Sequence, residues 1–132
     1  MISINNKPTE PRRTLEIFFE GAPMTKSNMK AYSRRTRCYF IPRAWKAWEE
    51  GIATQFQFKA PKGFEMFLGP LEVHLEFFYL PKQRTDLSNA EKGLFDALNK
   101  LLWKDDRQVI RIVKEKKISK EMPGIKIKVM EL

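Results

Sequence analysis

Apolar and polar residues alternate along four segments of the chain, which is the pattern of strands that bury one face. The predicted strands span residues 14–20, 71–80, 108–115 and 125–129. Residues 108–115 carry Ile or Val in both phases of the alternation, so we expect this strand to be buried on both faces for part of its length. Pro123 and Gly124 predict a turn before the last strand.

Two other segments repeat apolar residues at the spacing of a helix. The first follows Pro42, a residue suited to the first helical position, and the second spans residues 88–102. Their apolar residues are Trp45, Trp48, Ile52 and Phe56 in the first, and Leu94, Phe95, Leu98, Leu101 and Leu102 in the second. The order β-α-β-α-β-β and the short later connections predict an α+β fold, in which a small mixed or antiparallel sheet packs with two main helices.

The remaining segments predict one domain with a tail and a long loop. At 132 residues the chain can bury one core but not two, so we expect a flexible tail over residues 1–13 and a single domain over residues 14–132. Residues 21–38 are rich in Gly, Pro, Ser and basic residues, which predicts a long loop.

Charge gives the first indication of a partner. The net charge is +9, and no acidic residue lies between Glu20 and Glu49. The basic residues of that interval are Lys26, Lys30, Arg34, Arg35, Arg37, Arg43 and Lys46. Such residues bind phosphates without regard to sequence, so we expect a nucleic-acid partner, with Lys126 and Lys128 as lesser candidates for contacts. The alternative is a solvated basic surface that keeps the protein in solution.

Several classes of protein are excluded or disfavoured by the sequence. No apolar run approaches the ~20 residues that a membrane span needs, and residues 1–13 lack the apolar core of a signal peptide. We therefore expect a cytoplasmic protein with no membrane partner. The single cysteine excludes an internal disulfide and a cysteine-based zinc site. His74 has no metal-ligand partner at suitable spacing and is predicted to be an ordinary surface histidine.

Acidic residues flank the second predicted helix. Asp86 comes just before it, and Asp105 and Asp106 come just after it. Such a helix is about 22 Å long, so these carboxylates can meet only if the chain folds back or the subunits are arranged to bring them together. If they meet, they offer the oxygen ligands that Mg²⁺ prefers. The ion would activate water for attack on a phosphodiester, and Lys92, which points away from the core, could stabilise the developing charge.

Simpler explanations exist for each of these residues. The two adjacent aspartates are common turn residues. Lys92 and Asp96 are four positions apart and could form an exposed ion pair on the helix. Ser88 followed by Glu91 has the spacing of a capping box. The residues alone therefore leave a metal-dependent nuclease and an ordinary capped helix both open.

The spacing of these residues resembles a known family. The pattern D-L-S-N-x-x-K-x-x-x-D-A-L, followed by D-D-x-Q-V, is similar to the motif of the RusA family of Holliday junction endodeoxyribonucleases. The matching residues are Asp86, Asn89, Lys92, Asp96, Ala97, Leu98, Asp105, Asp106, Gln108 and Val109. The resemblance implies a small homodimer that cuts four-way DNA junctions in recombination and repair. It also implies the cofactor Mg²⁺, for which Mn²⁺ can substitute, and a bacterial or prophage source.

The resemblance also implies roles for individual residues. Asp86 and Asp106 would bind the metal, with Asp105 assisting. Lys92 would contribute to catalysis, and the Asn89 amide would orient a ligand. A two-fold dimer would present two such sites, which suits a junction that is nicked symmetrically.

Ser88 departs from the family motif, which has a second aspartate at this position. Ser88 could be a weaker, neutral metal ligand, or Asp105 or Asp96 could replace the missing acid. A third alternative is a catalytically weak or inactive protein that binds branched DNA on the same scaffold, and an RNA-binding protein is a further rival. We expect an active enzyme because the other acids and Lys92 are present.

Overall fold

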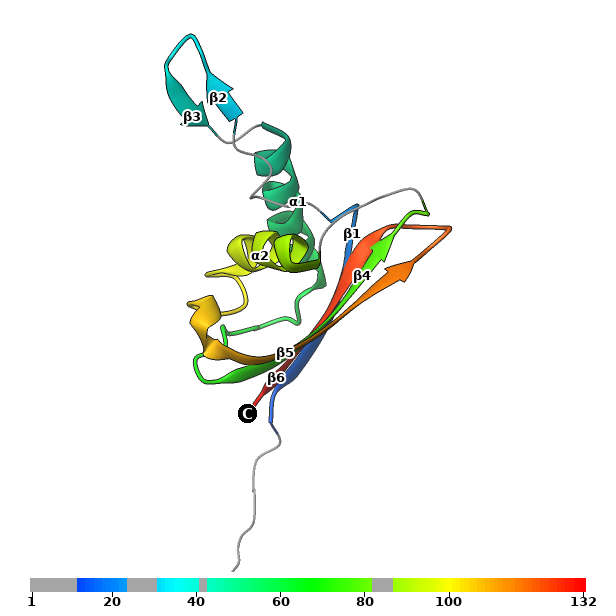
Figure 1. The fold of residues 1–132 in the computed structure, drawn as a ribbon. Coiled ribbons are helices and arrows are strands. Elements are labelled where there is room, and N and C mark those ends of the chain that lie inside the picture. Colours follow the sequence, from blue (N-terminus) through cyan, green and yellow to red (C-terminus); the bar gives the residue numbers. More distant parts are fainter. Residues whose placement is uncertain (1–11, 24–30, 41–42, 82–86) are drawn as a thin grey trace, which may run out of the picture.

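The computed structural model describes residues 12–23, 31–40, 43–81 and 87–132 (Figure 1). Of the residues singled out above, Lys26, Lys30, Pro42 and Asp86 lie outside the described residues, as do tail residues 1–11. The side chains of Ser88 and Asn89 are also outside them, although their backbone is described. No helix among the described residues is long and apolar enough to cross a membrane.

Four described strands form one mixed sheet. Across the sheet they lie in the order β1 (Thr14–Glu20), β6 (Gly124–Glu131), β4 (Leu71–Tyr79) and β5 (Val109–Ile118). β6 is antiparallel to both of its neighbours, whereas β5 is parallel to β4. A parallel pair needs a crossover connection, and the second helix supplies it here. The predicted α+β class and its mixed sheet are confirmed.

Two helices, α1 (Arg43–Lys59) and α2 (Leu87–Leu98), pack on one face of this sheet (Figure 1). Alternate residues of β1, β4 and β6 face them, because successive side chains of a strand point to opposite faces. The buried residues of these elements include Leu15, Ile17, Phe19, Trp45, Ile52, Phe56, Val73, Leu75, Phe77, Leu94, Leu98, Ile125, Ile127 and Val129. The apolar stripes read from the sequence therefore form the core.

The segment predicted as a long loop contains a hairpin, so that prediction is wrong for part of residues 21–38. β2 (Ala31–Ser33) pairs antiparallel with β3 (Cys38–Phe40). Strands of three residues are too short for their alternation to be visible in a sequence. The hairpin projects beyond the N-terminal end of α1, away from the sheet (Figure 1).

The second predicted helix ends earlier than its apolar stripe indicates. α2 stops at Leu98, and the chain turns at Lys100, whose φ is 71°. Leu102 and Trp103 follow this turn and are fully buried, so they continue the apolar pattern from outside the helix. Burial, and not helix periodicity, explains the apolar residues after Leu98.

β5 is not buried on both faces, so that prediction is also wrong. β4 lies on one side of it, and no other described strand pairs with its outer edge. Ile110 and Ile118 are 66% and 58% exposed, and Val113 is also exposed. The Ile and Val residues that indicated burial therefore lie along an open edge of the sheet.

Candidate active site

Asp105 and Asp106 form a tight turn immediately before β5. Asp106 begins the 3₁₀ helix η1 (Asp106–Gln108), and Asp105 is its N-cap with extended backbone. The Asp105 carboxylate accepts a hydrogen bond of 2.9 Å from the backbone N–H of Arg107. Capping of this kind satisfies an N–H group that has no partner within so short a helix. The turn explanation for the two aspartates is thus correct for Asp105.

The side chain of Gln108 holds the same turn from its other end. Its Oε1 atom accepts hydrogen bonds from the backbone N–H groups of Lys104 (2.9 Å) and Asp105 (3.1 Å). Its Nε2 atom donates to the backbone carbonyls of Phe67 (2.8 Å) and Gly69 (3.1 Å). The acidic turn is therefore tied to the segment that leads into β4.

The two aspartates differ in their electrostatic surroundings. Arg107 forms a salt bridge of 3.1 Å with Asp105, and its side-chain hydrogen bonds lower the pKa of the Asp105 carboxyl below the ordinary value of 3.8. No described residue forms a salt bridge with Asp106, which is partly exposed. Asp105 is thus engaged in holding the turn, whereas Asp106 is the carboxylate that can accept a ligand.

The donor chemistry of this turn suits a hard divalent cation, because such ions take carboxylate oxygens. Within the described residues, no three Asp, Glu, His or Cys side chains gather as a metal site. The predicted partner Asp86 lies outside those residues, so a site that combines Asp86 and Asp106 stays a prediction.

The start of α2 is separated from the acidic turn within one chain. α2 has 12 residues and is about 18 Å long. It begins above the middle of the sheet and runs toward the side where η1 and the start of β5 lie (Figure 1). A 2.8 Å salt bridge between Glu91 of α2 and Lys114, near the middle of β5, fixes this arrangement. Leu87, which follows Asp86 in the chain, is thus at the far end of the helix from Asp106.

This helix also decides among the simpler explanations of its polar residues. α2 begins at Leu87, so Ser88 lies inside the helix and not at its N-cap. Glu91 bonds to Lys114 across to the sheet, whereas a capping box requires it to reach back to the N-cap. Lys92 is exposed on α2, as predicted from its position opposite the apolar stripe.

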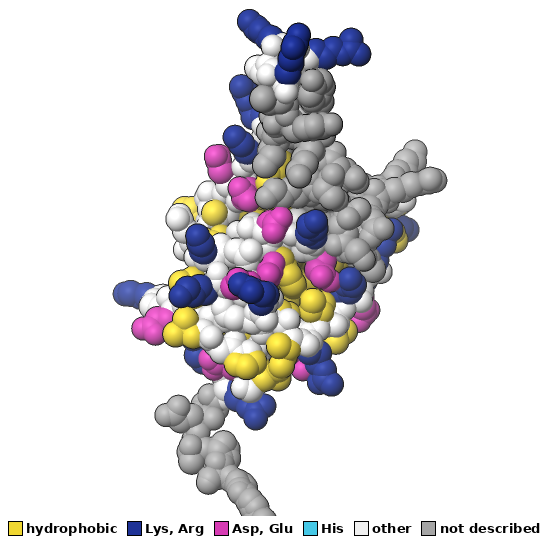
Figure 2. Space-filling view, turned by 60° about the vertical axis from the view of Figure 1, so that its left-hand side comes forward, with side chains coloured by type: hydrophobic (Ala, Val, Ile, Leu, Met, Phe, Trp, Pro, Cys, Tyr) yellow, Lys and Arg dark blue, Asp and Glu magenta, His cyan; other side chains and the backbone are white. Residues whose placement is uncertain are grey.

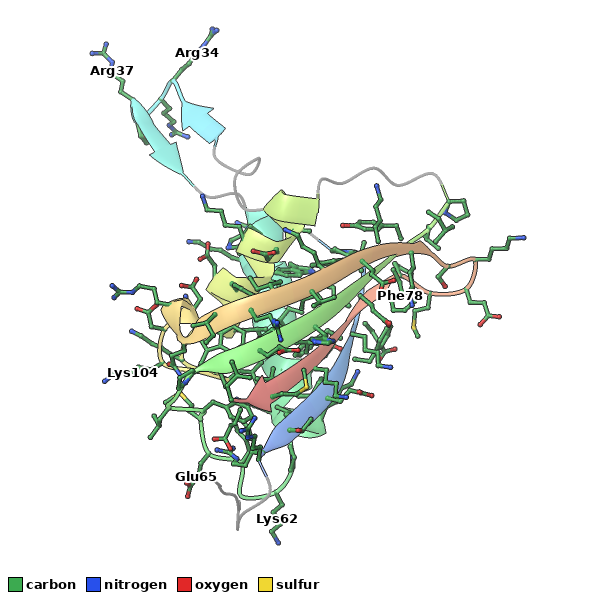
Figure 3. All side chains as sticks on the ribbon, turned by 60° about the horizontal axis from the view of Figure 1, so that its bottom comes forward. Arg34, Arg37, Lys62, Glu65, Phe78 and Lys104 are labelled. Atoms are coloured by element: carbon green, nitrogen blue, oxygen red, sulfur yellow. The ribbon has the colours of Figure 1, made fainter. Side chains whose placement is uncertain are left out.

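The basic residues predicted to contact phosphates gather on one part of the surface. Arg34, Arg35 and Arg37 occupy the turn of the β2–β3 hairpin and are exposed, and Arg43 and Lys46 are exposed in the first turns of α1. Figure 2 shows Lys and Arg side chains at the tip of this projection. In Figure 3, Arg34 and Arg37 point away from the body of the molecule.

The sheet face opposite the helices has a balanced charge. Three of its basic residues pair with glutamates on neighbouring strands: Arg111 with Glu72, Lys117 with Glu76, and Lys126 with Glu16. Lys126 is therefore a weaker candidate for DNA contacts than the hairpin arginines, and Lys128 stays a prediction. The hairpin arginines form no salt bridge with any residue that the structure describes, which makes that end of the molecule the better surface for a polyanion.

Comparison with known proteins identifies related sequences. The family model described as "Endodeoxyribonuclease RusA" matches residues 20–130. The "Crossover junction endodeoxyribonuclease rusA" of Enterobacteria phage 82 is 31% identical over 98 residues, a match that covers 70% of this chain and 78% of the phage protein. The matched region includes both helices, the basic hairpin and the acidic turn.

Proposed function

Since this chain belongs to the RusA endodeoxyribonuclease family, it is an endonuclease that hydrolyses DNA, and we propose that it resolves four-way DNA junctions in recombination and repair. The phage relative is named for cutting crossover junctions, which supports this substrate and a bacterial or prophage setting. The observation that carries the proposal is the pairing of an available carboxylate, Asp106, with a strongly basic projection on a chain of this family.

The proposed cofactor is Mg²⁺, with Mn²⁺ as a substitute. Asp86 and Asp106 would hold it, with Ser88 as a neutral oxygen donor and Asp105 in a supporting role because it is engaged by Arg107. A bound ion of this kind lowers the pKa of water and neutralises charge on phosphate. Lys92, exposed on α2, contributes a positive charge to the scissile phosphate, and the Asn89 amide orients a ligand.

The proposed DNA contacts are phosphate contacts made by the basic residues that precede and begin α1. The exposed arginines of the hairpin turn and the first basic residues of α1 support this role. Such contacts position the nucleic acid without reading its bases. The acidic turn and the hairpin both lie on the left in Figures 1 and 3, where Lys104 marks the start of the turn, so one branched substrate can contact both.

The proposed active form is a homodimer. Two features support it: the exposed Ile and Val residues along the open edge of β5, and the length of α2 between Leu87 and the acidic turn. A second copy can bring a carboxylate of one subunit to a carboxylate of the other, where one chain alone keeps the ends of the helix apart. Two-fold symmetry also gives two equivalent sites for two symmetric nicks.

The second candidate is a DNA-binding protein on the same scaffold with weak or no cleavage. The replacement of a motif aspartate by Ser88 favours this candidate, because a hydroxyl is a neutral and weaker ligand than a carboxylate. Its prediction is junction binding that depends on salt but no Mg²⁺-dependent cleavage.

Replacement of Asp106 by asparagine tests the enzyme. Asp106→Asn keeps the shape of the side chain but removes the charge that a divalent ion requires. We expect cleavage of a synthetic four-way junction in Mg²⁺ to fall by ~100-fold or more, because even residues that only support metal ligands cost about 10–100-fold. The measurement is the single-turnover cleavage rate on junction, duplex and RNA substrates, with and without Mg²⁺.

The control is Glu121→Gln, which makes the same change of charge at an exposed position between β5 and β6, at the opposite end of β5 from the acidic turn. Its cleavage rate should match that of the wild type. Unchanged cleavage by Asp106→Asn would remove Asp106 from the mechanism. Junction binding without cleavage by the wild-type protein would favour the second candidate.

A further inference from the structure

The side chain of Gln108 forms more hydrogen bonds than capping of η1 requires. Its amide offers two acceptor sites and two donor hydrogens, and all four are used. The partners are backbone groups from two segments: the N–H groups of Lys104 and Asp105, and the carbonyls of Phe67 and Gly69. The side chain thus joins the acidic turn to a segment about 40 residues earlier in the chain.

We propose that Gln108 is a positioning residue for the nuclease site: it holds the backbone of the acidic turn so that the Asp106 carboxylate is presented to a divalent cation. The inference rests on the proposed function of Asp106. Gln108 itself touches neither substrate nor cation, because its amide is saturated by protein backbone.

The need for such a residue follows from the shortness of η1. This 3₁₀ helix has three residues, and so few bonds cannot fix its orientation. The Asp105 side chain supports the turn from within, through Arg107, but both residues belong to the turn and move with it. Gln108 supplies side-chain bonds to backbone outside the turn, at Phe67 and Gly69.

The segment held by Gln108 is itself anchored in the core. Phe67 is buried, and its backbone N–H donates 2.9 Å to the carbonyl of Leu102. Trp103, also buried, pairs with Phe67 as a β-bridge. Gln108 therefore attaches the turn to a rigid part of the molecule. A metal ligand requires such support, because its position must hold to within about half an ångström.

Two substitutions separate the parts of this role. Gln108→Met has a similar length and no amide, so it loses all four hydrogen bonds. Gln108→Glu keeps the oxygen that accepts from Lys104 and Asp105 but replaces the donor by a second oxygen beside the carbonyls of Phe67 and Gly69. Both variants should make the acidic turn more mobile. In Gln108→Glu, the amides of Lys104 and Asp105 should keep part of their protection from hydrogen exchange.

Gln55→Met is the matched control. The Gln55 amide makes the same kind of bonds elsewhere: its Oε1 atom accepts 2.7 Å from the backbone N–H of Glu20, and its Nε2 atom donates 2.9 Å to the Glu20 carbonyl. These bonds join α1 to β1, at the opposite edge of the sheet from β5. Their loss should lower thermal stability, as loss of the Gln108 bonds would, without altering the position of Asp106.

The first readout requires no metal. We expect hydrogen–deuterium exchange at the amides of Lys104 and Asp105 to be slow in the wild type and at least ~10-fold faster in Gln108→Met, because a hydrogen-bonded amide exchanges only when its bond opens. The second readout is Mn²⁺ affinity, followed by electron paramagnetic resonance. It should weaken by about 10-fold in Gln108→Met, as is usual for residues that orient ligands.

Both readouts should be near wild type in Gln55→Met. Unchanged Mn²⁺ affinity in a folded Gln108→Met protein whose turn amides exchange faster would overturn the positioning role. If Gln108→Met does not fold, unchanged Mn²⁺ affinity in Gln108→Glu would do the same. If Asp106→Asn also binds Mn²⁺ and cleaves junctions normally, the proposed metal site itself is wrong. This result distinguishes failure of the proposed site from failure of the positioning role of Gln108 alone.

Discussion

The adjacent residues Asp105 and Asp106 differ in their interactions because Arg107 forms a salt bridge with only the first of them. Arg107 donates to the Asp105 carboxylate from both its backbone and its side chain, which leaves Asp105 as the structural member of the pair. Asp106 starts η1 without a salt bridge to any described residue. At the scale of single residues, the local hydrogen bonds decide which carboxylate remains available for chemistry.

Another acidic residue, Glu72, is predicted to make the stability of the fold depend on pH. It bonds to His74 (2.6 Å) and Arg111 (3.2 Å), and these two partners lower the pKa of its carboxyl below the ordinary value of 4.5. The folded protein therefore holds the charged form better than the unfolded chain does. The resulting stability is fully present above pH 4.5 and is lost as pH falls through the lowered folded-state pKa.

Glu72→Gln should accordingly unfold at a lower urea concentration than the wild type at pH 7. The difference between the two proteins should shrink as pH falls through the lowered pKa of Glu72, because the wild-type carboxyl then becomes protonated. The measurement is the urea midpoint from pH 7 to pH 3, with Glu65→Gln as the exposed control. A gap between Glu72→Gln and the wild type that stays constant over this range would contradict the assigned cause.

At the scale of elements, the β2–β3 hairpin is built as a projection and not as part of the core. Its strands have three residues each and, among the strands that the structure describes, pair with no others. Its turn carries three exposed arginines, and Arg37 there adopts a φ of 57°. A short arm with charged residues at its tip can reach a phosphate backbone without disturbing the rest of the fold.

Removal of the hairpin arginines should weaken DNA binding through its electrostatic part. In the triple variant Arg34→Ala, Arg35→Ala, Arg37→Ala, we expect the slope of log affinity against log salt to fall in magnitude by about 2 to 3, since each phosphate contact contributes ~0.9. The measurement is the binding of a four-way junction over a range of NaCl concentrations.

The matched control removes three exposed basic residues that are not predicted contacts: Arg12→Ala, Lys62→Ala, Lys120→Ala. It changes the net charge by the same amount as the arginine variant. An equal fall of the salt slope in both variants would mean that net charge, and not the hairpin, accounts for the binding.

At the scale of the whole molecule, the sheet has one covered face, one charge-paired face and one open edge. The helices cover the first, and salt bridges between neighbouring strands neutralise the second. The edge of β5 remains, with exposed isoleucines and no described strand beside it. Open edges of this kind favour pairing with another chain, which supports the proposed homodimer.

We therefore expect the wild type to be a dimer and the double variant Ile110→Gln, Ile118→Gln to be a monomer. Burial of one Ile side chain contributes ~1.5–3 kcal/mol, so loss of two in each subunit should weaken association by at least ~100-fold. Light scattering after gel filtration measures the mass. Phe58→Gln is the control, because Phe58 is 85% exposed on α1 and away from β5. A monomeric wild type at micromolar concentration, or a variant that remains dimeric, would contradict this interface.

Much of the fold was readable from the sequence because burial imposes a period on it. The strand over residues 14–20, the strand that begins at Leu71 and the apolar stripe of α2 all agree with the structure, since each packs one face on a common core. The motif from Asp86 to Val109 also pointed to the family that residues 20–130 match. Gln108 was visible as part of that motif, but its spacing alone indicated no role.

Periodicity and the motif were enough to give the α+β class, most of the core on β1, β4, β6 and the helices, and the family. They did not reveal that β5 is an exposed edge, that the basic segment forms a hairpin, or that Gln108 bonds to Phe67 and Gly69. The physical reason is the range of the interactions involved. Periodicity reports local burial along the chain, whereas a strand's neighbours and a side chain's distant backbone partners depend on how the whole chain packs.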